Sequence, residues 1–272
     1  MKPSFLLFVF LINSGTAGAQ EPIVLMNYSA QRAFFDDFQK RTHEPGFHFA
    51  DSGPLEGDSS TDAKASIDAI LEDPWLRKTY SAGDAVFLSR HIRRQKGNRY
   101  HMDFSLSVVD SVSGREVEMQ LETANRRPAQ PLYGRLRFPL TLRAAPTSME
   151  ETQVNDSIRL PKIAAGSQLT WNPDTGNRKG VFISVYFSLR NKPNIESWGH
   201  GGFRERTNCM RADDTGGISL PKALFEGIPG GSIVIITILR GNWSDLYQRD
   251  GSYSPIHFSA WTIRDGLFVF SY

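Results

Sequence analysis

The residues whose types could do chemistry are first of all the histidines of the N-terminal half and the acids beside them. The segment HEPGFH (residues 43–48) superficially resembles the His-Glu-x-x-His pattern of zinc proteases. In that pattern both histidines lie on one face of a helix, one turn apart. His48 comes one residue too late for this, and Pro45 interrupts a helix. We therefore interpret the segment as a polar loop and predict no metal site.

Motifs for nucleotide binding and acyl transfer are absent from the sequence, which contains no P-loop, no dinucleotide-binding glycine pattern and no G-x-S-x-G. The segment Asp213–Gly217 (DDTGG) lacks the spaced ligands of a calcium loop, so we interpret it as a solvated turn. The sequence thus predicts no catalytic residue and no cofactor. A hydrolase with its site in the N-terminal half stays an alternative, in which an acid would converge with one of the histidines: His43, His48, His91 and His101.

A glycine-rich segment with aromatic side chains is the most unusual local feature. It runs from Trp198 to Phe203 (WGHGGF) and includes His200. Exposed aromatic rings on a loop are a common means of holding a sugar or a peptide. Trp243 and Tyr247, which follow an apolar strand, could belong to the same rim, so these five residues are the candidate ligand-binding set. In the alternative interpretation the rings fold back and pack against the end of the domain.

The charge balance argues against polyanionic partners. The formal net charge is +2 at pH 7, which gives no electrostatic reason to expect nucleic acid or an anionic membrane surface. Arg135, Arg137 and Arg143 form a basic stripe, which we interpret as a solvated outer face balanced by Glu116 and Glu118. Binding of an anionic ligand along this stripe stays an alternative.

Residues 1–19 have the order of features found in a cleavable secretory signal peptide. Lys2 precedes an apolar run at Phe5–Ile12, and small residues at Ala17–Ala19 provide the cleavage site. The run is too short to span a bilayer, and no later segment reaches that length. The expected location is the periplasm or the extracellular medium. Cys209 is the only cysteine, so no internal disulfide can form, and we predict a small buried side chain there.

Residues 20–143 predict a β-rich α+β domain with two short helices. Ser29 is expected to cap a helix that runs to about Lys40, and a second helix is expected from Thr61 to about Glu72. The period then changes from helical to alternating. This predicts strands at Ala85–Ile92, Arg99–Asp110, Val117–Leu121 and Leu132–Leu142, with a turn at Ser111–Gly114 joining the second and third as a hairpin.

Residues 144–156 break the alternation and predict a linker, after which residues 157–272 read as short strands separated by turns. Two apolar runs, VFISVYFSL and SIVIITIL, are typical of central strands. The further strands are expected at Ser157–Leu160, Gln168–Trp171, His257–Ile263 and Leu267–Ser271, with a turn at Arg264–Gly266. This punctuation favours an antiparallel β-sandwich of immunoglobulin-like (Ig-like) type.

The run GSQLTWNPDTGNRKGVFISVYF, followed by ISLPKALFEGIPGGSIVIITILRGN, resembles the C-terminal Ig-like modules of uncharacterised exported proteins of Bacteroidota-type bacteria. The resemblance covers roughly the last 115 residues and implies a fold and a bacterial origin, but no catalytic residue. We therefore expect an exported, non-enzymatic binding or structural accessory protein of the bacterial envelope that contacts a protein or a glycan. A carbohydrate-binding module that uses the loop aromatics is the first alternative, and the hydrolase is the second.

Overall fold

The structure of the protein, a computed structural model, is mainly β. It describes residues 23–25, 46–56, 63–73, 78–79, 83–96, 99–122, 131–147, 150–156, 158–188, 205–249 and 253–272. Within these ranges a 14-stranded sheet dominates, and a three-stranded and a two-stranded sheet accompany it. None of the helices in these ranges has the length and hydropathy of a transmembrane span.

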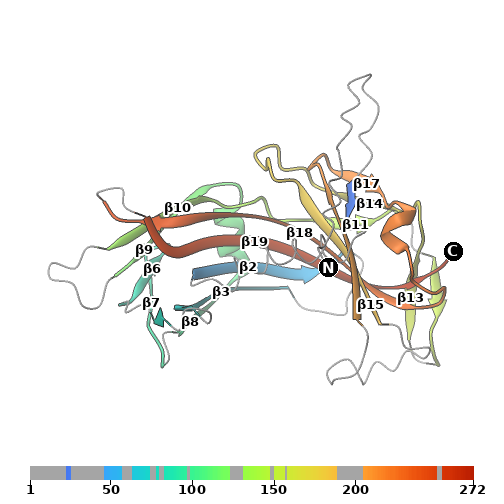
Figure 1. Ribbon diagram of the computed structural model, residues 1–272, viewed down its shortest axis with the longest axis horizontal. Helices are drawn as coiled ribbons and strands as arrows, with labels where there is room; N and C mark the ends of the chain where they lie inside the picture. The colour runs from blue at the N-terminus through green and yellow to red at the C-terminus, as the bar shows by residue number, and fades with distance from the viewer. Residues whose placement is uncertain are drawn as a thin grey trace, which may run out of the picture.

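A long antiparallel hairpin runs through the molecule from end to end (Figure 1). It consists of β18 (Ile233–Tyr247) and β19 (Tyr253–Phe270), which are paired from Ile233↔Val269 to Tyr247↔Tyr253. Alternate residues of a strand point to the same face of the sheet, so the same face of the hairpin continues from one end to the other. This face contributes to two separate hydrophobic cores, one at each end of the hairpin.

The first core lies inside a strongly curled part of the large sheet, whose end strands β7 and β8 approach each other. It is rich in aromatic side chains, with ring centroids of contacting pairs 5.0 to 6.0 Å apart. A short helix, α2 (Leu106–Val112), buries Val109 and Val112 against it. The strands, in spatial order around β18 and β19, are β7 (Arg90–Ile92), β6 (Ala85–Phe87), β9 (Glu116–Leu121), β10 (Leu132–Arg137), β18, β19, β2 (Gly46–Pro54), β3 (Lys64–Ile70) and β8 (Arg99–Phe104).

The second core lies between the other end of the large sheet and the three-stranded sheet. Apolar residues of β15 (Val181–Ser188), β18 and β19 face Leu169 and Trp171 of β14 across it. The remaining large-sheet strands here are β1 (Ile23–Leu25), β16 (Glu205–Ala212), β13 (Arg159–Ile163) and its partner β12 (Glu151–Gln153). The small sheet contains β11 (Ala144–Pro146), β14 (Gln168–Trp171) and β17 (Gly217–Ser219). A 3-10 helix, η2 (Lys222–Phe225), contacts β15 and β16 and buries Leu224 and Phe225 in the second core. A separate pair of strands is β4 (Glu72–Asp73) and β5 (Lys78–Thr79).

The helix predicted at Thr61–Glu72 is wrong, because β3 occupies Lys64–Ile70. Ala65, Ile67 and Ala69 are all buried, so the inward face has a period of two. Two of its three inward residues are alanines, which hide a strand pattern from a search for bulky apolar residues. The other predicted helix, after Ser29, lies outside the described residues.

Several predicted strands are confirmed with different ends or partners. The strand expected at Ala85–Ile92 is a tight hairpin, in which Leu88 and Ser89 take positive φ values at the turn. The strand expected at Arg99–Asp110 stops at Phe104, and α2 follows. The predicted hairpin between this strand and Val117–Leu121 is wrong, since β8 pairs with β3 and β9 pairs with β6 and β10.

In the C-terminal half β14 matches its predicted bounds, and the two apolar runs form the adjacent strands β15 and β18. The turn predicted at Arg264–Gly266 is wrong, because these residues lie inside β19, where Asp265 accepts a hydrogen bond of 2.6 Å from the Thr237 hydroxyl. The segment 144–156, predicted as a linker, contributes β11 and β12. The division into residues 20–143 and 157–272 stays a prediction, and the hairpin β18–β19 packs in both cores.

A close approach in the middle of the hairpin yields a stability prediction. A Cβ atom added at Gly241 would lie 1.8 Å from a carbon of the Trp261 ring. The ring is buried and cannot move aside freely. We expect Gly241→Ala to lower the free energy of unfolding, measured by urea titration, by more than about 3 kcal/mol. Gly217→Ala is the control, because its Cβ would meet its nearest atom at 3.3 Å; equal losses in the two variants would contradict the packing described here.

Candidate functional site

On the face of the hairpin that enters the cores, the middle is polar and the two ends are apolar. On the face that enters the cores, Val234–Ile238 and Phe268–Phe270 supply residues of the second core, and Phe258 and Ala260 belong to the first. The positions between them are polar: Arg240, Asn242, Thr262 and Arg264. Buried charges are costly unless they are paired. The surroundings of these residues must therefore supply partners.

Arg240 is the most deeply buried charge of this region, with none of its surface exposed. Its Nη2 donates to the carbonyl oxygen of Asn172 at 2.5 Å and lies 3.4 Å from Oδ1 of Asp214. Desolvation lowers the pKa of the Arg240 guanidinium, and the carboxylates of Asp214 and Asp174 oppose this effect. The side chain thus acts as a cation that ties the hairpin to the loops on top of it.

One stretch of sequence, TWNPDTGN (residues 170–177), supplies several members of the network, among them the Asn172 carbonyl that Arg240 binds. The Asn172 side chain accepts from the backbone N–H of Arg143 at 2.7 Å and donates to the carbonyl of Thr141 at 2.9 Å. Asp214 receives hydrogen bonds from the Trp171 indole and the Asn177 amide. The stretch is therefore tied both to the segment around Thr141–Arg143 and to Asp214.

Asp174 closes the network on the other side. Its carboxylate, 1% exposed, accepts two hydrogen bonds from the Arg137 guanidinium, at 2.7 and 3.0 Å, and one each from the N–H groups of Leu140 and Gly176. Burial alone would raise the pKa of Asp174, but the Arg137 guanidinium and the two N–H donors lower it below its usual value. The predicted stripe of arginines is thus divided, with Arg137 inside the network and Arg135 paired with Glu118 on the surface.

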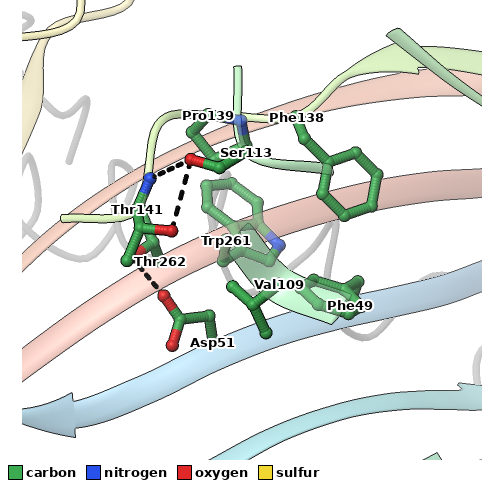
Figure 2. Close-up of a pocket in the computed structure, with 9 residues that line it drawn as sticks. All are labelled: Phe49, Asp51, Val109, Ser113, Phe138, Pro139, Thr141, Trp261 and Thr262. Carbon is green, nitrogen blue, oxygen red and sulfur yellow. Dashed lines mark hydrogen bonds between the residues drawn. The ribbon is translucent and has the colours of Figure 1, made fainter. Parts of the chain in front are cut away.

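Asp51 of β2 joins the network from the side of the first core and is 2% exposed. Its Oδ2 accepts from the Thr262 hydroxyl at 2.9 Å and from Nη2 of Arg264 at 3.0 Å. Its other oxygen, Oδ1, is buried and has no hydrogen-bond partner among the described residues. Figure 2 shows the carboxylate below Thr262, beside a small cavity. This cavity measures about 10 Å³, and the hydroxyls of Ser113 and Thr141 also line it.

A larger cleft of about 260 Å³ opens next to this cavity and shares Asp51, Val109 and Thr141 with it. Three charged side chains that line it, Glu56, Asp110 and Arg143, are exposed and take part in no ion pair within the described ranges. Leu106, one of the exposed large hydrophobic residues of the protein, is 50% exposed at its edge. The complete lining is Asp51, Glu56, Ala63, Leu106, Val109, Asp110, Thr141, Leu142, Arg143 and Arg264.

The candidate residues from the loop aromatics do not line this cleft. Trp198, His200 and Phe203 lie outside the described residues. Trp243 stacks on Trp261 with ring centroids 5.9 Å apart, and the Lys179 ammonium lies 2.9 Å from its ring centroid. Tyr247 is half-buried opposite Tyr133 of β10. The two described members of the set therefore have protein neighbours of their own, and the carbohydrate hypothesis stays a prediction.

Of the histidines considered for a hydrolase, His43 lies outside the described residues and neither cavity contains any of the others. His48 shares a hydrogen bond of 2.8 Å with the Ser259 hydroxyl. His101 lies between two carboxylates, with its Nδ1 2.7 Å from Asp68 and its Nε2 3.3 Å from Asp103. His91 is exposed on β7. The hydrolase alternative also stays a prediction.

Metal ligands do not converge in the described part of the chain, where no three His, Cys, Asp or Glu side chains form a group that could hold an ion. Asp214, in the predicted DDTGG turn, is instead held by Trp171 and Asn177. The Cys209 thiol is buried, as predicted, and burial raises its pKa to about 11. A thiol with this pKa is almost wholly protonated at neutral pH, so the structure places it among inert core cysteines.

The polar loop predicted at residues 43–48 is wrong from Gly46 onward, because Gly46–Pro54 is a strand with alternate burial. Within that alternation, Asp51 falls on the inward face after Phe47 and Phe49. An acid in register with two inward phenylalanines is the signal that could have revealed its burial.

No known protein family matches this sequence, and no curated protein is similar to it. The function of the protein must therefore be inferred from the geometry of the network and the cleft.

The network yields a prediction about Asp174. We expect Asp174→Ala to lower the free energy of unfolding by about 3 kcal/mol or more, because the Arg137 cation and two N–H donors lose their buried partner. Urea denaturation at pH 7 measures the change. The control is Glu118→Ala, which removes the exposed partner of Arg135, a neighbour of Arg137 on β10, and should cost far less because water screens this pair. Similar losses for the two variants would show that Asp174 is not a structural anchor.

His101 yields a prediction about pH. The hydrogen bond to Asp68 raises the pKa of His101 above 6.5, and Asp103 adds to this effect. Since the folded-state pKa is raised, the ion pair stabilises the fold fully below the unfolded-state pKa and is lost as the pH rises through the folded-state pKa. An NMR titration of the ring protons should give a pKa above 6.5. Asp68→Asn should lower it more than Asp103→Asn does; the reverse order would contradict the geometry.

Proposed function

We propose that this chain is an exported, non-enzymatic accessory protein of a bacterial envelope, and that it binds a small ligand in the cleft between its two cores. Support for export comes from the signal-like residues 1–19. Support for binding comes from the cleft, where the exposed side chains of Glu56, Asp110 and Arg143 take part in no ion pair within the described ranges. The destination after export is the periplasm or the extracellular medium.

The observation that carries the proposal is the buried carboxylate oxygen of Asp51 that lacks a hydrogen-bond partner among the described residues. Proteins satisfy nearly all their buried polar atoms, so a buried carboxylate oxygen without a partner requires an explanation. Oδ1 of Asp51 has no partner among the described residues, and Asp51 lines both the cavity and the adjoining cleft. The position can therefore accept a hydrogen bond from a water or from a ligand group.

The walls of the cleft are firmly held, which favours binding without rearrangement. The backbone N–H of Glu56 donates to the carbonyl of Ala144 at 2.8 Å, and that of Arg143 donates to Asn172 at 2.7 Å. Asp110 is on α2, which the first core anchors through Val109 and Val112. A preorganised site loses less conformational entropy when a ligand binds.

The proposal extends to the fold of the second half, for which we propose an Ig-like sandwich. Two sheets face each other across the second core, in line with that architecture. The resemblance of residues 166–187 and 218–242 to exported Ig-like modules supports the same assignment. In this architecture the loops at the ends of the strands commonly carry the binding residues.

Ligand screening with the mature chain, residues 20–272, tests the proposal. Small charged and polar metabolites are tested by their effect on Tm. A ligand at roughly one hundred times its Kd stabilises a protein by about 2.7 kcal/mol, which raises the Tm of a chain of this size by about 5 °C or more. We expect at least one such ligand.

The matched variants are Arg143→Ala and Glu56→Gln, which change exposed cleft residues and leave the network intact. Both should reduce the ligand-induced rise in Tm, and Asp103→Asn, an exposed change on β8, should preserve it. The proposal is wrong if no metabolite raises the Tm, or if the cleft variants respond as the unchanged protein does.

A further inference from the structure

The charges around the cleft differ in sign from one part to the next, and this bears on the ligand. Asp51, Glu56 and Asp110 supply carboxylates, and Arg143 and Arg264 supply guanidinium groups. One pair of these charges is already matched, because Arg264 binds Asp51. Among the described residues, the charges of the cleft that remain without partners are the carboxylates of Glu56 and Asp110 and the guanidinium of Arg143.

We infer that the ligand of the cleft is a small zwitterion, with an ammonium group, a carboxylate and a short aliphatic side chain, as in a free amino acid. This inference rests on the proposed binding function and specifies its substrate class. The ammonium would meet the acidic side of the cleft, and the carboxylate would meet Arg143.

The ammonium end has the stronger structural basis. Oδ1 of Asp51 is buried and unpartnered, and a carboxylate oxygen can only accept a hydrogen bond. The group that satisfies it must therefore be a donor, and an ammonium offers three donors. The positive charge of the ammonium also counters the negative charges of Glu56 and Asp110, which pair with no cation within the described ranges.

The carboxylate end is assigned to Arg143 because the two arginines of the cleft differ. Arg264 donates through Nη1 to the carbonyls of Asp51 and Ile263 and through Nη2 to the Asp51 carboxylate. The Arg143 guanidinium has no such partners in the described ranges, although its backbone N–H is fixed by Asn172. A guanidinium fork suits a planar carboxylate, which it can bind through two parallel hydrogen bonds.

The apolar surface and the size of the cleft set the rest of the ligand. Leu106 is half-exposed, and Val109 lines the cleft one helical turn further along α2. A short aliphatic side chain placed against them removes apolar surface from water. The volume of about 260 Å³ is below the range of roughly 300 to 1,000 Å³ typical of sites for drug-sized molecules, in line with a ligand of a few heavy atoms.

Three compounds that share the same branched aliphatic chain test this assignment by isothermal titration calorimetry on the mature chain. They are leucine, 3-methylbutylamine, which lacks the carboxylate, and 4-methylpentanoate, which lacks the ammonium. Leucine should bind most tightly. Each analogue should bind at least about tenfold more weakly, because it leaves charged groups of the cleft without partners. Glucose is the uncharged comparison and should not bind.

Substitutions at two positions identify which side chain binds the carboxylate of the ligand and which binds its ammonium group. Arg143→Ala should abolish the preference for leucine over 3-methylbutylamine, and Arg143→Lys should restore part of it. Asp110→Asn should reduce the preference for leucine over 4-methylpentanoate. Both residues are exposed, and circular dichroism confirms that each variant is folded before binding is measured.

Each outcome bears on one of the two proposals. If 3-methylbutylamine binds as tightly as leucine, the cleft is a simple cation site and the zwitterion assignment is overturned. If none of the three compounds binds but another metabolite raises the Tm through cleft residues, the assignment fails and the binding function stands. If no compound of either panel binds, both proposals fail.

Discussion

The fold depends on how the charged middle of one hairpin is buried. β18 and β19 continue from one hydrophobic core into the other, and the transition between them falls at Arg240 and Arg264. A buried guanidinium is tolerated only when carboxylates and carbonyls surround it. Asp51 pairs with Arg264, Asp214 lies beside Arg240, and the charge of Asp174 also acts on Arg240. Nε and Nη1 of Arg240 have no hydrogen-bond partner within the described residues, so this compensation is incomplete.

This requirement explains two short sequence features whose roles are not evident from composition. In the run Arg240–Asn242, the arginine is the buried cation, the glycine leaves room for the Trp261 ring, and the asparagine donates to the carbonyl of Arg137 at 2.8 Å. In the run 170–177, almost every polar side chain has a partner in the network.

The sequence predicted those elements whose pattern depends on local residues. The apolar runs of β15 and β18 and the alternation of β9, β10 and β14 were sufficient to place these strands, and the mainly β character followed from them. β3 was misread because its inward residues are mostly alanine, and the turn at Leu88–Ser89 gave no glycine or asparagine signal. The continuous course of β19 through Arg264–Gly266 could not be predicted, because partners distant in sequence, Asp51 and Thr237, stabilise it.

The register of β2 could have shown that Asp51 is buried, but not the cleft itself, because segments far apart in sequence bring Asp51 and Arg143 to it. One feature of the cleft, the buried Oδ1 of Asp51 without a partner among the described residues, has an energetic consequence. A buried carboxylate oxygen without a partner costs about 1–3 kcal/mol or more relative to one that is satisfied. The chain satisfies Asp174 with four donors but Asp51 with only two, both at Oδ2, although Thr141 and Ser113 lie beside the same cavity. Oγ of Ser113 accepts from both the N–H and the hydroxyl of Thr141, so the Thr141 hydroxyl donates to Ser113 and not to Asp51. Oδ1 of Asp51 is therefore an acceptor that no donor among the described residues satisfies.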